Sequence, residues 1–205
     1  CKPAGLLVHR SEVATADRVF ALQEARDLLG QPVYPAHRLD RGTSGLLVLA
    51  LSREVQAALG RAWQEGVAKV YLAAVRGWIG APLAIVKPLA PVRDPYLRTQ
   101  RTEPQPAFTA VLPLALAEAP FASPPYGRTR LTLAAAAIAT GRRHQIRRHL
   151  KAAAHPVIGD ATYGKGPLNR AFAAWCGARR LMLHCARMRL AHPVTGVQMT
   201  LSAQP

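Results

Sequence analysis

Three consecutive segments in the first half of the chain limit its fold most. Residues 45–51 form a continuous apolar run whose length is typical of a buried strand. A helix is predicted over residues 52–66, because Ser52 can cap its start, Gly66 can end it, and apolar residues recur between them at helical spacing. The alternating segment 69–77 predicts a second strand. A fold that combines strands and helices is therefore expected.

The rest of the chain continues this mixture. Residues 81–106 contain six prolines and show little periodicity, which predicts loop or edge structure. Periodicity predicts the later elements, which are strands over 107–115 and 128–141, a helix over 141–155, and two strands that flank the turn at 192–196. We expect one α/β domain with a largely antiparallel sheet.

The charge of the chain limits its partners. Its 205 residues carry a formal net charge of +16, which indicates a polyanionic partner, with nucleic acid the first candidate and an anionic membrane surface the second. Residues 119–205 contain thirteen Lys and Arg and one acid, Asp160, whereas residues 1–118 contain fourteen basic and ten acidic residues. The C-terminal part is thus the expected binding surface. The alternative is a set of solvated basic faces.

Cysteine usage and short motifs exclude several classes of protein. Cys1, Cys176 and Cys185 are odd in number and form no CxxC motif, so a reducing cytoplasmic setting fits better than a disulfide framework. No apolar run approaches the roughly 20 residues of a membrane span, and no signal peptide is recognisable. The histidines lack metal-ligand spacing, and the sequence has no GxGxxG, Walker or GxSxG motif. We expect a cytoplasmic protein without metal, nucleotide cofactor or membrane partner.

One acid stands in an unusual place. Asp40 lies between Arg38 and Arg41, and nearby positive charge favours the ionised form of a carboxyl group. Such a carboxylate can act as a nucleophile or a general base, and the following Gly-Thr-Ser-Gly segment allows a tight turn. The alternative is an Asp that caps the turn and pairs with an arginine, and this segment alone favours that alternative.

The basic helix over 141–155 is a candidate phosphate-binding element. Thr140 can cap it, and its first N–H groups together with Arg142 and Arg143 can hold phosphate. The alternative is a solvated basic face. Arg147 lies near the apolar stripe of the helix, where an arginine needs an acidic partner, and Asp40 is the acid with an evident need for one.

A tyrosine is the third candidate. Tyr71, in the strand predicted over 69–77, can stack on a base and offer its hydroxyl at the ring edge. The alternative is an ordinary half-buried strand tyrosine, and the residue alone favours it.

Four motifs occur together in an order that resembles the RluA-type pseudouridine synthases. The matching segments are HRLDRGTSGLLVLA, KVYLAAVRG, TGRRHQIRRHL and HPVIGDATYG. The similarity extends from KPAGLLVHRS to RLMLHCARMRLAHPVTG and so covers nearly the whole chain. The resemblance implies an isomerase that converts uridine in RNA to pseudouridine without a cofactor.

The resemblance also implies a fold. It implies a single α+β catalytic domain over residues 1–205, with a mixed, mostly antiparallel, bent sheet and flanking helices. It implies no separate RNA-binding domain. Cys1 stands where the family has Asn, so we expect the family's N-terminal strand to be missing from this chain.

The resemblance implies roles for individual residues. Asp40 matches the catalytic aspartate, and attack at C1′, attack at the base and proton removal from C2′ all stay open for it. Tyr71 would stack on the target base, and Arg147 would pair with Asp40. The expected RNA-binding residues are Arg38, Arg41, Arg142, Arg143, His144, Arg148 and Lys151.

Details of the sequence resemble the branch of the family that modifies the uridine at position 65 of tRNA. We therefore expect a monomer that acts on tRNA. A ribosomal RNA synthase of the same family is the alternative, and a non-catalytic RNA-binding protein is the alternative from another class.

Overall fold

The computed structural model describes residues 1–9, 19–92 and 103–205. The chain divides into two compact units. Unit 1 comprises Cys1–Lys69 and Cys185–Pro205, and unit 2 comprises Val70–His184. Helices and strands are mixed along the chain, which confirms the α+β class. Within the described ranges, no helix is long and apolar enough to cross a membrane.

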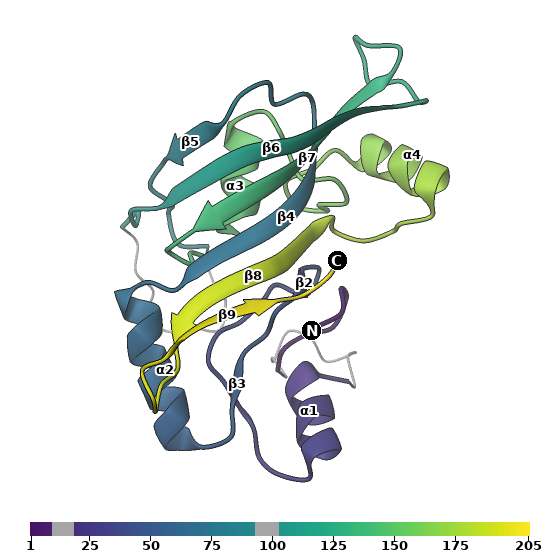
Figure 1. The fold of residues 1–205 in the computed structure, drawn as a ribbon. Coiled ribbons are helices and arrows are strands. Elements are labelled where there is room, and N and C mark those ends of the chain that lie inside the picture. The colour runs from purple at the N-terminus through teal and green to yellow at the C-terminus, as the bar shows by residue number, and fades with distance from the viewer. Residues whose placement is uncertain (10–18, 93–102) are drawn as a thin grey trace. The chain divides into compact units, whose positions relative to one another are not determined.

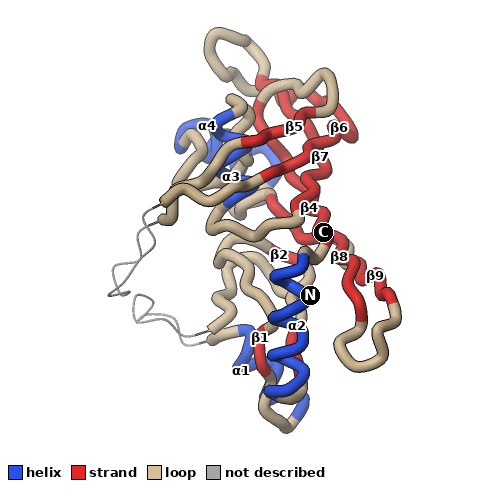
Figure 2. Tube along the Cα trace, turned by 90° about the vertical axis from the view of Figure 1, so that its left-hand side faces the viewer, coloured by secondary structure: helices blue, strands red, loops and turns tan. Residues whose placement is uncertain are grey.

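Unit 1 combines helices with short strands (Figure 1). Its helices are α1 (Ala21–Leu29) and α2 (Arg53–Glu65), and its short strands are β1 (Tyr34–Pro35), β2 (Ser44–Gly45) and β3 (Leu49–Ala50). Helix α2 packs against β1, beside which it lies in Figure 2, and against β3. Strands β1 and β3 pair antiparallel. Strand β8 (Leu183–Ala191) begins in unit 2 and continues into unit 1, where it pairs with β2 and, antiparallel, with β9 (Gln198–Ser202).

Unit 2 is built on a sheet with the strand order β4-β7-β6-β5. These strands are β4 (Ala68–Arg76), β5 (Leu83–Val86), β6 (Phe108–Ala119) and β7 (Thr129–Ile138). Pairings β5–β6 and β6–β7 are antiparallel. Helix α3 (Gln145–Ala152) lies on one face of this sheet beside β6 (Figure 1), and helix α4 (Gly166–Cys176) follows it along the chain.

Periodicity predicted most of the regular elements. The helix over 52–66 is confirmed as α2, and the Oγ of Ser52 accepts the Val55 N–H at 3.2 Å as its N-cap. Strands β4, β6 and β7 and the β8–β9 hairpin lie where they were predicted. Helices α1 and α4 were not predicted. Helix α4 begins with Pro167 in its first turn and ends at Gly177 in the left-handed region, which are ordinary helix signals.

The predicted continuous strand over 45–51 is wrong. The structure has only β2 and β3 there, and they belong to different sheets. Gly45 has a φ of 109° and approaches the backbone of Cys185 so closely that a Cβ would overlap with it. Leu46 N–H then donates to Cys185 O at 3.0 Å. The close approach at Gly45 thus ends the first strand before the apolar run is over.

The basic helix begins later than predicted. Helix α3 starts at Gln145, and Thr140 does not cap it. The side-chain oxygen of Gln145 instead accepts hydrogen bonds from the Thr140 hydroxyl at 2.8 Å and from Arg142 N–H at 3.1 Å. His144 takes a left-handed conformation with a φ of 56°. Arg142 and Arg143 therefore lie in a turn before the helix and not on it.

The described part of the proline-rich region contains the edge strand β5. Strand β5 stands at the end of the strand order, as the prediction of loop or edge structure over 81–106 allows. Leu89 and Gln105 exchange backbone hydrogen bonds at 2.9 and 3.0 Å beyond it. The prediction for residues 93–102 lies outside the described residues.

A compact apolar cluster anchors α4 in unit 2. It joins buried residues of β6, β7, α4 and the loop before α4, which are Ala119, Leu131, Ile158, Leu168 and Phe172. The loop that carries Ile158 also contains Gly159, whose φ is 77°. A Cβ at Gly159 would overlap with the carbonyl oxygen of Arg180. Only glycine fits this position.

Substitution of Gly159 tests this close approach. Gly177 has a similar φ of 74° but nothing within 4 Å of the position of a Cβ, so it is a matched control. Gly177→Ala should lower the free energy of unfolding by about 1 kcal/mol through the left-handed conformation alone. Gly159→Ala should lower it by about 2 kcal/mol more because of steric overlap. Urea denaturation measures both, and equal losses would contradict the packing described here.

Candidate functional site

Asp40 lies in a turn that backbone hydrogen bonds hold in unit 1. Thr43 N–H donates to Asp40 O at 3.1 Å and closes the turn, and Gly5 N–H donates to Arg41 O at 2.8 Å. Asp40 is half-buried, whereas Arg38 and Arg41 are exposed. The turn thus presents a carboxylate with partial access to solvent between two exposed cations.

Lys2 is a buried cation that supports this turn. It is 3% exposed, and its Nζ donates to Pro3 O at 2.8 Å, Leu6 O at 2.7 Å and Arg41 O at 3.2 Å. Burial lowers the pKa of Lys2 to about 8, and the charge of Asp40 opposes this shift. Sequence reasoning did not assign Lys2 to the site, although the KPAG segment is part of the resemblance.

Lys2 also connects this turn to β2. Lys2 and Gly45 exchange two backbone hydrogen bonds, at 2.8 and 2.9 Å. Gly45 follows Asp40 by five residues and lies against β8 at Cys185. The backbone on both sides of Asp40 is therefore fixed by short contacts within unit 1.

An aromatic stack supports the segment that precedes Asp40. The rings of His37 and Trp63 are stacked with their centroids 5.0 Å apart, and Lys69 Nζ lies 6.0 Å from the Trp63 ring. Burial, with a smaller effect of Lys69, lowers the pKa of His37 to about 4. His37 is therefore neutral at pH 7, and its Nε2 accepts the Val48 N–H at 3.0 Å. The stacked, neutral His37 ring therefore fixes the start of the HRLDRGTSGLLVLA motif and adds no positive charge beside Asp40.

Unit 2 contains a buried ion pair. Arg147 on α3 donates to Asp160 through Nε at 2.7 Å and through Nη2 at 2.9 Å. Their side chains are 9% and 0% exposed. Asp160 also accepts the N–H groups of Thr162 and Tyr163, each at 2.9 Å. A bidentate contact with additional donors is the arrangement that keeps a buried carboxylate ionised.

The pKa of Asp160 reflects these contacts. Burial raises it, but hydrogen bonds from Arg147 and from the Tyr163 and Thr162 backbone lower it more, so the net pKa lies below its ordinary value. Asp160 is therefore an anion at neutral pH. This anion matches the need of Arg147 for an acidic partner.

This ion pair corrects one argument from the sequence. Arg147 was assigned to Asp40 because a buried arginine needs an acid, and Asp160 meets that need. Asp160 is thirteen residues from Arg147 in the HPVIGDATYG motif, which was recognised but not placed in the site. The pairing of Arg147 with Asp40 stays a prediction, because the two residues belong to different units.

Tyr163 links two of the predicted residues. Its hydroxyl and His144 Nδ1 are hydrogen-bonded at 3.0 Å, and the Arg147 guanidinium lies 5.1 Å from the centre of its ring. The hydrogen bond to Tyr163 thus connects His144, with its left-handed backbone, to the loop that carries Asp160. Sequence reasoning missed Tyr163, which the same HPVIGDATYG motif contains.

A second buried network joins α3 to β6. Gln145 Nε2 donates to Phe108 O at 2.9 Å and to Thr109 Oγ1 at 3.3 Å. His149 is completely buried, and its two ring nitrogens contact Thr109 Oγ1 and Lys87 O, each at 2.9 Å. Burial lowers the pKa of His149, so the ring is neutral and donates from Nε2 to the Lys87 carbonyl. The HQIRRH segment thus supplies both the basic residues and the polar contacts that hold them.

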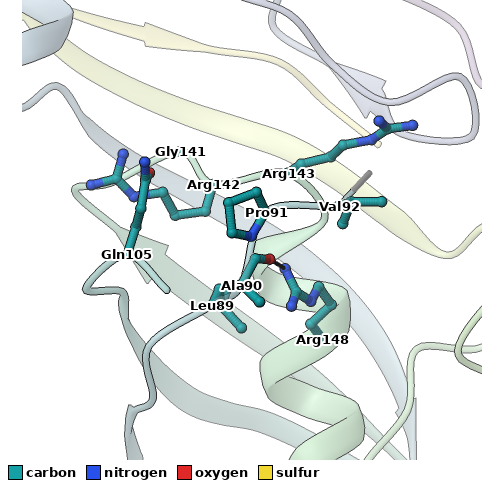
Figure 3. A pocket seen from close by; sticks show the side chains of 9 residues that line it. All are labelled: Leu89, Ala90, Pro91, Val92, Gln105, Gly141, Arg142, Arg143 and Arg148. Atoms are coloured by element: carbon teal, nitrogen blue, oxygen red, sulfur yellow. Dashed lines mark hydrogen bonds between the residues drawn. The ribbon is translucent and has the colours of Figure 1, made fainter. Parts of the chain in front are cut away.

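Three predicted RNA-binding arginines border one pocket. Leu89–Val92, Gln105 and Gly141 complete its lining beside Arg142, Arg143 and Arg148 (Figure 3). Arg148 donates to Ala90 O at 2.8 Å, and Arg142 donates to Pro106 O at 3.4 Å. Arg143 extends away from both (Figure 3) and is exposed. The lining of the pocket thus carries three arginines, and an anion-binding surface requires such positive charge.

The structure groups the predicted residues by unit. Unit 1 holds Arg38, Asp40 and Arg41, and unit 2 holds the other predicted residues. Tyr71 is buried on β4 with 8% exposure, and Lys151 is exposed on α3. Among the described residues, no group of three His, Cys, Asp or Glu side chains is arranged to hold a metal ion.

Comparison with known proteins identifies the family. A family model described as RNA pseudouridylate synthase matches residues 1–152, which include the Asp40 turn, Tyr71 and Arg147. The chain belongs to the RNA pseudouridylate synthase family. The isomerase class implied by the four motifs is thereby confirmed.

Relatives within the family are similar over nearly the whole chain. The tRNA pseudouridine synthase C of Yersinia pestis is 42% identical over 99% of this chain and 80% of its own length. The protein of the same name from Pasteurella multocida is 43% identical over 98% of this chain and 85% of its own length. The protein of the same name from Vibrio cholerae is 41% identical over 98% of this chain and 84% of its own length.

Solved structures of the family share the fold. Human RNA pseudouridylate synthase domain containing 1 superposes with a TM-score of 0.72 at 23% identity, covering 98% of this chain and 83% of its own. Human RNA pseudouridylate synthase domain containing 4 gives a TM-score of 0.69 at 21% identity, covering 99% of this chain and 83% of its own. At this identity the similarity concerns the fold alone.

Asp160→Asn tests the buried ion pair. The substitution leaves Arg147 buried beside a neutral group, so the free energy of unfolding should fall by about 3–5 kcal/mol at pH 7. Glu118→Gln removes the exposed Arg128–Glu118 pair, at 3.2 Å, and should cost at most about 1 kcal/mol. Urea denaturation compares the two variants.

The pH dependence of the free energy of unfolding also tests the ion pair. The pKa of Asp160 is lower in the folded state than its ordinary value of 3.8, so its ionisation stabilises the fold above that value. The difference between wild type and Asp160→Asn should be constant above about pH 5 and should shrink as the pH falls below about 4. A difference that grows on acidification would contradict the ion pair.

Proposed function

We propose that this chain converts uridine to pseudouridine in tRNA, with Asp40 as the catalytic carboxylate. The observation that carries the proposal is the similarity, over 98–99% of the chain, to proteins named tRNA pseudouridine synthase C. The uridine at position 65 of tRNA is the target that the sequence resemblance suggests. We further propose that the two units act together as one catalytic domain and that the protein works as a monomer in the cytoplasm.

The reaction is an isomerisation, so all atoms of the product except exchanged protons come from the substrate. The N1–C1′ bond breaks, the base turns, and a C5–C1′ bond forms. C5 loses a proton and N1 gains one, so no oxidant, reductant or transferred group is required. A carboxylate, a site that shields the reacting atoms from water and firm control of the base meet these needs.

Asp40 has the position that such a carboxylate needs. It is half-buried, so an RNA base can reach it, and its turn is held by the backbone of Lys2 and Gly5 and by the Lys2 ammonium. The carboxylate acts either as a nucleophile or as a base toward the ribose. Flipping the target nucleotide out of its helix costs a few kcal/mol, which contacts to the RNA backbone must offset.

Residues of both units have proposed roles in this reaction. Tyr71 stacks on the target base and takes part in removal of the C5 proton. Arg147 orients Asp40, and the bidentate contact with Asp160 fixes the guanidinium for that task. Arg38 occupies the space that the flipped base leaves. The residues proposed to bind phosphate or RNA are Arg41, Arg142, Arg143, His144, Arg148 and Lys151.

Asp40→Asn tests the catalytic assignment. The amide keeps the size of the side chain but cannot act as nucleophile or base, so pseudouridine formation in bulk tRNA should fall below detection while tRNA binding persists. Asp27→Asn is the matched control, because Asp27 is exposed and pairs with its neighbour Arg26 at 2.7 Å. It should retain full activity. Substantial product from Asp40→Asn, mapped and quantified in the treated tRNA, would overturn the assignment.

A further inference from the structure

The β8–β9 hairpin carries a row of polar side chains that the reaction does not use. Arg187 and Arg189 are exposed, whereas Met188 and Leu190 between and beside them are 0% and 4% exposed. The strand therefore turns its apolar side inward and its two arginines to solvent. The two arginines lie on one face of the strand, with their Cα atoms about 6.6 Å apart along it.

The antiparallel register places hydroxyl groups beside these arginines. Ser202 pairs with Arg187, and Thr200 pairs with Arg189. Residues directly opposite in an antiparallel pair share a face of the sheet, so two guanidiniums and two hydroxyls form one surface. We call Arg187, Arg189, Thr200 and Ser202 the ribbon face. All four are exposed.

The ribbon face has charge without compensation. In the part of the chain that the structure describes, neither the Arg187 nor the Arg189 side chain has a hydrogen-bond or carboxylate partner. The sequence from Ala161 to Pro205 contains no Asp or Glu at all. Guanidiniums held on a rigid strand without an acidic partner are suited to an external anion, and hydroxyls are common donors to phosphate oxygens.

The ribbon face belongs to the same unit as the catalytic carboxylate. Arg187 is two residues beyond Cys185, whose carbonyl accepts the Leu46 N–H at 3.0 Å. Leu46 lies six residues after Asp40. One strand thus runs from the contact beside the Asp40 motif to the two arginines.

We propose that the ribbon face binds the phosphate backbone of the RNA next to the target uridine. This inference deepens the proposed function and rests on it for the identity of the RNA. Arg187 and Arg189 contact successive phosphates of one strand, and Thr200 and Ser202 donate to the same groups. The surface reads no bases, so it positions the substrate and adds affinity for any sequence.

The salt dependence of binding tests the ribbon face. Affinity for end-labelled bulk tRNA is measured by fluorescence anisotropy over a series of KCl concentrations. Each arginine that contacts a phosphate contributes about 1 to the slope of log Kd against log salt. The double variant Arg187→Gln and Arg189→Gln should therefore reduce the slope by about 2. Thermal denaturation of each variant confirms that it is folded.

A second double variant controls for net charge. Arg53 and Arg61 are exposed on α2 in the same unit, so Arg53→Gln with Arg61→Gln removes the same charge elsewhere. Its slope should equal that of the wild type. A wild-type slope in the ribbon variant, or an equal reduction in both variants, would overturn the proposal. Binding of tRNA does not require turnover. If the protein forms no pseudouridine, the salt dependence of its tRNA affinity therefore still tests the ribbon face.

Discussion

The buried ion pair between Arg147 and Asp160 is the interaction on which the organisation of unit 2 depends. It connects the basic helix α3 to the loop that precedes α4. Asn169 on α4 holds the same loop, because its side chain donates to Asp160 O at 3.0 Å and accepts the Gly159 N–H at 2.9 Å. Asp160 is also the only acid between residues 119 and 205.

The Asp40 turn is held in a different way. Its backbone is held by hydrogen bonds from Lys2, Gly5 and Thr43. Arg147 and Asp160, in contrast, hold the fold through their side chains, which pair with each other in the interior of unit 2. This division explains why substitution of Asp40 should affect activity, and substitution of Asp160 stability.

Local periodicity and caps were sufficient to predict α2, β4 and the β8–β9 hairpin, because each depends on its own residues. The end of β2 at Gly45 could not be predicted, because the close approach of Gly45 to Cys185 joins residues 140 positions apart. The start of α3 was misplaced for a local reason, since the Gln145 side chain accepts hydrogen bonds from the Thr140 hydroxyl and the Arg142 N–H. The partner of Arg147 lay in a recognised motif, but only the folded loop brings it to the helix.

The most direct test of the account is the release of tritium from RNA labelled at C5 of uridine, because joining C5 to C1′ expels that hydrogen. The account predicts that the protein, without added cofactor, releases about one equivalent of tritium per molecule from a tRNA substrate and leaves one pseudouridine there. Ribosomal RNA labelled in the same way should release none. Release from ribosomal RNA alone would contradict the proposed substrate, and binding of both RNAs without any release would show a protein that binds RNA and does not modify it.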